Sequence, residues 1–151
     1  MKIRPYKTED SVNVRDLILS ILEKEYPFDK SAYNDTDIND ITGTYSGEES
    51  AFFVIEDKGQ IAGSVGVKKD ADDTALVRRL FVGEDYRRKG YGSMLLKKAV
   101  DFCKEKSYKK IVFRATDRMK EAMALCKKTG FVEKEDLEVS GFHIHKFLLE
   151  L

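Results

Sequence analysis

The chain has 151 residues, a length typical of one domain that buries a substantial hydrophobic core. Its 27 basic residues balance 27 acidic ones, which disfavours a general nucleic-acid binder, because such proteins carry an excess of Lys and Arg. No apolar run reaches the roughly 18–20 residues of a membrane-spanning helix, and no signal peptide is visible. Only two cysteines occur, which suits a reducing compartment. We therefore expect a single cytoplasmic domain over residues 1–151, away from membranes.

The first half of the chain predicts helices followed by strands. Val14, Ile18 and Ile21 recur at helical spacing, and their helix should end before Pro27, because the residue before a proline disfavours helical geometry. A Gly-containing turn at residues 57–60 separates two short apolar runs, as in a hairpin. The predicted elements are a helix from about residue 11 that ends before Pro27, without a helical Tyr26, a helix over residues 37–45, and strands over residues 51–55, 61–67 and 75–82.

Strands alternate with helices in the second half. An amphipathic pattern that buries Leu95, Ala99 and Cys103 predicts a long helix. The predicted elements are helices over residues 91–106 and 119–128 and strands over residues 110–113, 131–139 and 142–149. Because two helical crossovers join these strands, we expect an α/β or α+β fold whose sheet carries helices on both faces.

A glycine-rich turn at residues 87–93, Arg-Arg-Lys-Gly-Tyr-Gly-Ser, lies between the apolar run that ends at Val82 and the helix over residues 91–106. The first amides of a helix lack internal partners and carry the positive end of the helix dipole, so an anionic phosphate can bind there. The two glycines let the backbone approach a ligand, and the three cations add charge. The turn therefore predicts an anion site. The alternative is a solvated surface turn whose glycines serve only the backbone geometry.

The turn and its flanks resemble the GNAT superfamily of N-acetyltransferases, whose signature Arg/Gln-x-x-Gly-x-Gly/Ala is present as Arg87-x-x-Gly90-x-Gly92. The segment Leu80-Phe81-Val82 is similar to the end of the family's fourth strand, and Gly130-Phe131 to the exit from its late helix. The resemblance covers essentially the whole chain. It implies a twisted mixed sheet of about seven strands, flanked by helices on both faces, that splays between its fourth and fifth strands.

The resemblance further implies an enzyme that transfers an acetyl group from its co-substrate acetyl-CoA to a primary amine of a small molecule or protein. The amine attacks directly in a ternary complex, and a backbone amide near Val82 polarises the thioester oxygen. The alternative is a catalytically silent module that binds acyl-CoA as a sensor or interaction domain. The resemblance also allows the protein to be a homodimer. The implied cofactor-binding residues are Leu80, Phe81, Val82, Arg87, Arg88, Lys89, Gly90, Tyr91, Gly92 and Ser93.

The proton-transfer groups match the family pattern less well. Many relatives have a Tyr on the late helix, as the acid for the departing thiolate, where this chain has Cys126. Cys126 is therefore a catalytic candidate, and the alternative is a buried packing residue, since free Cys is often found in cores. Met119 and Arg114 likewise replace an Asn and a Glu that other relatives use. Further candidates for the proton-transfer groups are Glu25, Asp29, Tyr45, His143 and His145.

Two other features allow more than one interpretation. Alternation places His143 and His145 on one face of the last strand, which is typical of a surface or cross-strand pair. Because no Cys or carboxylate lies at a matching sequence spacing, we expect no metal site. Carboxylates gather in residues 23–40, where relatives build the acceptor site. They would attract a cationic amine, or they form an ordinary solvated face.

Overall fold

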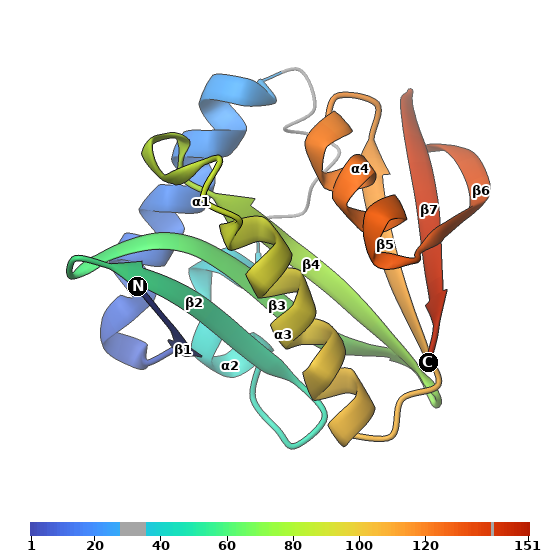
Figure 1. Ribbon diagram of the computed structural model, residues 1–151, viewed down its shortest axis with the longest axis horizontal. Helices are drawn as coiled ribbons and strands as arrows, with labels where there is room; N and C mark the ends of the chain where they lie inside the picture. Colours follow the sequence, from blue (N-terminus) through green and yellow to red (C-terminus); the bar gives the residue numbers. More distant parts are fainter. Residues whose placement is uncertain (28–35, 140) are drawn as a thin grey trace.

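The computed structural model describes residues 1–27, 36–139 and 141–151 (Figure 1). Within these ranges, seven strands form one sheet in the order β1-β2-β3-β4-β5-β7-β6. The strands are β1 (Lys2–Pro5), β2 (Ala51–Asp57), β3 (Gln60–Ala71), β4 (Thr74–Val82), β5 (Lys110–Thr116), β6 (Val132–Val139) and β7 (Phe142–Glu150). Neighbouring strands are antiparallel except for the parallel pair β4 and β5. The predicted mixed sheet of about seven strands is confirmed.

Helices cover both faces of the sheet, as expected. The α-helices are α1 (Ser11–Glu25), α2 (Ile41–Thr44), α3 (Tyr91–Glu105) and α4 (Lys120–Thr129), and short 3-10 helices are η1 (Thr8–Asp10), η3 (Asp37–Asn39) and η4 (Glu84–Tyr86). Figure 1 shows α3 in front of the sheet and α2 behind it. The surroundings of two glycines of β3 agree with this arrangement. A Cβ on Gly63 would meet Leu95 of α3, and a Cβ on Gly66 would meet Tyr45, which follows α2. None of the helices described is both long and apolar enough to cross a membrane.

The first helix follows its sequence pattern closely. Its apolar stripe, with Val14, Ile18 and Ile21, is buried against the sheet, and α1 ends at Glu25, before Pro27. The single helix predicted over residues 37–45 is wrong, because the structure divides this segment into η3 and α2. At the division, Asp40 has a non-helical backbone, and its side chain accepts a hydrogen bond from the N–H of Gly43 at 3.0 Å. Asp40 therefore acts as an N-cap and starts a new helix.

The strands β4 and β5 separate after a short stretch of pairing. Their register joins Thr74 with Lys110 and extends only to Leu76 with Val112. Near the point of separation, Arg79 has a left-handed backbone (φ 56°), and the register between β3 and β4 shifts there. The hydroxyl of Ser64 donates to the carbonyl of Arg79 at 2.8 Å, which satisfies the displaced backbone group. Past Leu76, the edge of β4 that faces β5 therefore has no strand partner among the described residues.

Candidate functional site

A cleft of about 270 Å³ lies where β4 ends and α3 and α4 begin. Nine of the ten predicted cofactor residues line it, and Lys89 is the one that does not. Its lining consists of Ile21, Tyr26, Leu80, Phe81, Val82, Tyr86, Arg87, Arg88, Gly90, Tyr91, Gly92, Ser93, Met119, Glu121, Ala122 and Leu125. The strand end and the glycine-rich turn, which are separate features of the sequence, therefore share one concave surface.

The N-terminus of α3 supplies backbone donors to this cleft. Gly90 precedes the helix with a left-handed backbone (φ 79°), and it offers no side chain to cap the first turn. The N–H of Met94 bonds to the carbonyl of Gly90 at 3.1 Å, which begins the helical pattern. The amides of residues 91–93 come before that bond, so they have no intrahelical acceptor. Together with the helix dipole, they favour an anion at this end of the cleft.

Gly92 and Gly90 differ in what a side chain would meet. A Cβ on Gly92 would lie 3.3 Å from Leu125 Cδ2 and 3.8 Å from Val82 Cγ2, within the cleft. A Cβ on Gly90 would meet no heavy atom within 4 Å among the described residues, but φ 79° is unfavourable for any residue with a Cβ. Gly92 therefore keeps the cleft open, whereas Gly90 allows the turn that leads into α3.

The three cations of the turn have different surroundings. Arg87 forms an ion pair with Glu25 of α1, and its Nε donates to the carbonyl of Val82 at 3.2 Å. The hydrogen bonds to Glu25 raise the pKa of Arg87 above its usual value. Lys89 lies 3.5 Å from Asp57. Arg88 is exposed and makes no ion pair within residues 1–27, 36–139 and 141–151, so its charge faces the cleft uncompensated.

Tyr91 fixes the first turn of α3 to the sheet. Its hydroxyl donates to Asp57 Oδ2 at 2.7 Å, and both residues are buried. This hydrogen bond lowers the pKa of Asp57 and raises the pKa of Tyr91. The bond holds the donors of α3 in a constant position relative to β2.

The amide of Val82 points toward the open side of β4. One residue later, the N–H of Gly83 donates to the carbonyl of Ala62 at 2.8 Å, in the direction of β3. Because successive backbone groups of an antiparallel strand alternate in direction, the N–H and C=O of Val82 point away from β3. The hydrogen bond from Arg87 Nε to the Val82 carbonyl agrees with this direction.

Cys126, the catalytic candidate, lies outside the lining of the cleft. Its side chain is fully buried, and burial raises its pKa to about 12. Cys103 on α3 is equally buried, and its pKa is also raised to about 12. These properties fit the packing role that the sequence left open for Cys126.

The carboxylates of the acidic segment have structural partners where the structure describes them. Glu25 binds Arg87, Asp40 caps α2, and Asp37 binds the buried guanidinium of Arg79 at 2.6 Å. The predicted base Tyr45 donates to Asp37 at 2.7 Å, and burial raises its pKa well above the usual value. Asp29, another candidate, lies outside the described residues.

The two histidines have carboxylate neighbours that the sequence spacing did not reveal. The His143 and His145 rings lie 4.4 Å apart on β7, and Asp117, which follows β5, contacts both. Glu133 and Asp136 of β6 also contact the pair. Hydrogen bonds to Glu133 and Asp117 raise the pKa of His145. None of these five residues is in the lining of the cleft.

Sequence reasoning missed part of the lining. Tyr26 comes from the end of α1, Tyr86 from η4, and Glu121 from the first turn of α4. Only Glu121 had a sequence signal, as an acidic residue at a helix start, and that signal indicates helix capping rather than a site. Met119, which the sequence identified only as a departure from the family pattern, also lies in the cleft.

A second hollow of about 590 Å³ lies toward the other end of α3. It shares no lining residue with the cleft, and its lining includes Tyr6, Thr42, Phe52, Lys98 and Lys106. Among the described residues, the glycine-rich turn and the N-terminus of α3 line the cleft and not this hollow. We therefore place the candidate site in the smaller cleft, where the chemistry for an anionic ligand is concentrated.

Known proteins with similar sequences are N-acetyltransferases. The model of the acetyltransferase (GNAT) family matches residues 15–131, and the match ends before β6. The chain is 30% identical to "Probable N-acetyltransferase camello" of Xenopus tropicalis over 114 residues, which are 74% of this chain and 52% of that protein. It is 31% identical to human N-acetyltransferase 8 over 102 residues, which are 64% of this chain and 45% of that protein. The chain thus spans about half the length of these curated relatives.

Solved structures agree on the fold. An N-acetyltransferase from Staphylococcus aureus Mu50 superposes with a TM-score of 0.85 at 18% identity, covering 99% of this chain and 97% of that one. A structure from Salmonella typhimurium, determined with its cofactor acetyl-CoA, superposes with a TM-score of 0.80 at 17% identity, covering 99% and 93%. At these identities the superpositions show the fold alone. Because the family model matches residues 15–131, well over half of the sequence, the chain belongs to the acetyltransferase (GNAT) family.

Proposed function

We propose that this protein transfers an acetyl group from acetyl-CoA to a primary amine. The observation that carries the proposal is the uncapped N-terminus of α3, which opens into the cleft beside the unpaired half of β4. Acetyl transfer is the general reaction of the family to which the chain belongs. The cleft combines a place for an anion at one end with backbone groups of β4 at the other.

We place the pyrophosphate of acetyl-CoA on the amides of residues 91–93, with Arg88 adding charge. Backbone donors and a helix dipole bind a phosphate without a dedicated side chain. The open edge of β4 past Leu76 would pair with the amide groups of the pantetheine arm, as an added strand does. The direction of the Val82 amide supports its role as the donor to the thioester oxygen.

The amine would attack the thioester directly, because the described lining of the cleft includes no cysteine, and no histidine that could activate Ser93 to form an acyl-enzyme. Binding in register makes such a reaction effectively unimolecular, so the attack needs no acyl-enzyme. The proton of the amine would leave through water. The acceptor is a small-molecule or protein amine.

A thermal-shift titration tests the binding half of the proposal. A ligand that binds only the folded protein raises its Tm by mass action. We expect CoA and acetyl-CoA to raise the Tm, and adenosine, which lacks the pyrophosphate, to leave it unchanged at the same concentration. An unchanged Tm with CoA would contradict the proposal.

Release of free thiol from acetyl-CoA, measured across a panel of polyamines, amino acids and peptides, tests the chemical half. We expect release that depends on at least one amine. Binding of CoA without release across the panel would instead indicate a silent acyl-CoA-binding module. Cys126, buried outside the lining of the cleft, is the observation that favours this second possibility.

A further inference from the structure

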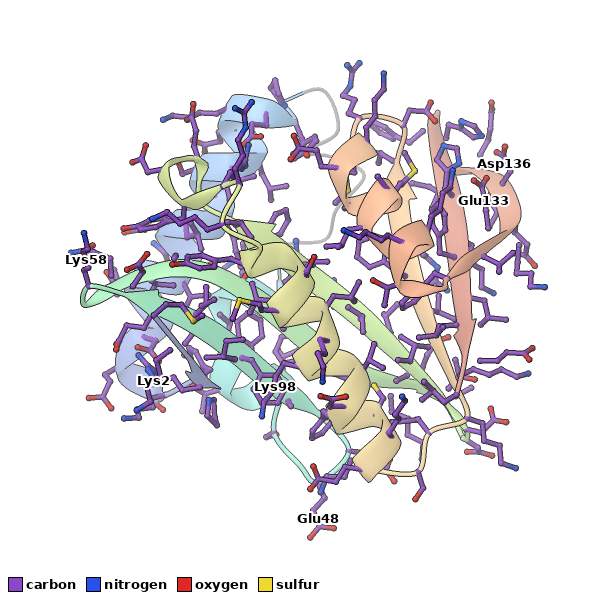
Figure 2. The ribbon with its side chains drawn as sticks, viewed as in Figure 1. Lys2, Glu48, Lys58, Lys98, Glu133 and Asp136 are labelled. Carbon is purple, nitrogen blue, oxygen red and sulfur yellow. The ribbon has the colours of Figure 1, made fainter. Side chains whose placement is uncertain are left out.

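Two histidines and three carboxylates form a cluster at the β5-β7-β6 edge of the sheet. The chain has only two histidines, and both lie on β7, the middle strand of the three. Asp117 contacts them from the end of β5, and Glu133 and Asp136 contact them from β6. Figure 2 shows the two labelled β6 carboxylates on the same side of the sheet, near the upper end of β7.

A bulge in β6 brings both Glu133 and Asp136 to this face. Residues 133 and 136 would lie on opposite faces of a regular strand, because side chains alternate. The register of β6 and β7 shifts between Glu133 and Glu135, so that Glu133 pairs with Phe147 and Asp136 with His145. Phe147 and His145 are two residues apart on β7 and share a face. The extra residue in β6 therefore places Glu133 and Asp136 beside the histidines and turns Glu135, which pairs with Lys146, to the other face.

The five residues form two shells. In the inner shell, Asp117 Oδ1 lies 2.7 Å from His143 Nδ1 and 2.5 Å from His145 Nε2. His143 Nδ1 and His145 Nε2 therefore face the same carboxylate, that of Asp117.

The outer shell contacts the other nitrogen of each ring. Glu133 Oε2 lies 2.9 Å from His145 Nδ1, and Asp136 contacts His143 Nε2. A neutral imidazole has one N–H and one lone pair. If each N–H points to its outer carboxylate, each lone pair points to the inner oxygen of Asp117, and a cation between them would bind all three atoms.

We propose that Asp117, His143 and His145 bind a divalent transition-metal ion of the zinc class. One ligand atom from each residue lies within 4.8 Å of the other two. Ligands about 2.0–2.1 Å from a zinc ion lie roughly 3–4 Å apart, so small rotations of these side chains complete the site. Asp117 is exposed, and solvent can supply a fourth ligand.

The ligand chemistry selects the kind of ion. Imidazole nitrogens suit zinc, copper, nickel and iron, whereas magnesium and calcium prefer oxygen ligands alone. Glu133 and Asp136 take the place of the outer carboxylates that orient metal-bound histidines and fix their tautomers. The ion joins β7 to the loop before α4, two residues from Met119 in the cleft lining.

The experiment uses the full chain without a histidine tag, freed of metal by a chelator, and titrated with ZnCl2 by calorimetry. We expect one Zn²⁺ per chain, a higher Tm with Zn²⁺, and no binding of Mg²⁺. Nuclear magnetic resonance of the imidazole groups gives a second readout. Because the chain has two histidines, both ring signals must shift as Zn²⁺ binds.

Variants locate the ion. Loss of an outer partner costs about 10- to 100-fold in metal affinity, so Glu133→Gln should lose about that much and His143→Ala or His145→Ala at least as much. Glu135→Gln is the matched control, because it removes one charge from the same strand on the opposite face. Should a histidine variant fail to fold, Asp117→Asn at an exposed position takes its place. The proposal is overturned if Zn²⁺ does not bind, if Mg²⁺ binds equally well, or if all variants bind as the parent does.

Discussion

Arg87 and Glu25 form a bidentate ion pair, with Nη1–Oε1 and Nη2–Oε2 distances of 2.7 and 2.6 Å. The pair joins the end of α1 to the turn before α3, and the two side chains are 29% and 30% exposed. The two terminal nitrogens of Arg87, the first residue of the signature, are thus bound to the Glu25 carboxylate of the same chain. We therefore expect Arg87 to position the turn, and the amides of α3, together with Arg88, to contact a phosphate.

A double-mutant cycle measures this ion pair. Exposed pairs contribute about 0.2–1 kcal/mol, and we expect Arg87→Ala and Glu25→Gln to show a coupling near the upper end, because their geometry is bidentate and partly buried. Urea denaturation of the parent, both single variants and the double variant gives the coupling. The exposed pair Lys97 and Asp101, at 2.7 Å on α3, is the control, with an expected coupling of about 0.3–0.5 kcal/mol. A coupling at Arg87 no larger than the control would contradict the positioning role.

Gly92→Val is expected to abolish the Tm increase caused by CoA and to leave the fold intact. The new side chain enters the cleft between Val82 and Leu125, while a helix tolerates Val at this position at least as well as Gly. Thermal shift with CoA and circular dichroism without it are the measurements. Lys104→Val, at an exposed position of the same helix, should keep the Tm increase. Full retention in the Gly92 variant would show that the turn does not hold the ligand.

Asp37→Asn should lower the free energy of unfolding by about 3–5 kcal/mol. Asp37 and Arg79 form an ion pair whose side chains are 5% and 3% exposed, and the substitution removes the charge of the Asp37 carboxylate from beside a buried guanidinium. Chemical denaturation measures the change. Asp40→Asn is the control, because Asn caps a helix as well as Asp does and little change is expected. Equal effects of the two substitutions would rule out a special cost at the buried pair.

The same buried pair should make stability depend on acid pH. Burial alone would raise the pKa of Asp37, but hydrogen bonds from Arg79 and Tyr45 hold it below its usual value. The hydrogen bond from Arg4 lowers the pKa of Asp10 in the same way. Because the folded pKa values are depressed, this stability is present above the unfolded value of about 3.9 and is lost as the pH falls below it. Urea midpoints should rise between pH 3 and pH 6 and rise less in Asp37→Asn; parallel curves would contradict this assignment.

Cys126→Ala should leave the rate of acetyl transfer nearly unchanged. Its thiol is buried outside the cleft lining, so the substitution acts on packing rather than on proton transfer. Cys103→Ala, at an equally buried position with the same raised pKa, is the matched control. Steady-state kinetics of both variants is the measurement. General acids contribute about 10²- to 10⁴-fold, so a loss of that size at Cys126 alone would restore it as the acid.

The sequence predicted the order of the strands and helices because each segment carries its own periodicity. Val14, Ile18 and Ile21 mark the buried side of α1 whatever lies opposite. The helix over residues 37–45 could not be resolved in this way. Its interruption depends on the side chain of Asp40 bonding to Gly43, and a pattern of apolar residues does not record such a bond.

The sequence by itself determined the glycine-rich entrance to α3, because Gly90 and Gly92 act through their own backbones and need no distant partner. Tertiary structure alone decided which side chains meet. It assigned the guanidinium of Arg87 to Glu25, and it placed Asp117 against two histidines 26 and 28 residues away. Such contacts follow from strand register and from a one-residue bulge in β6, which are fixed only when the whole sheet packs. The predicted anion end of the cleft is therefore local and readable from sequence, whereas the Arg87–Glu25 pair and the histidine cluster are properties of the fold.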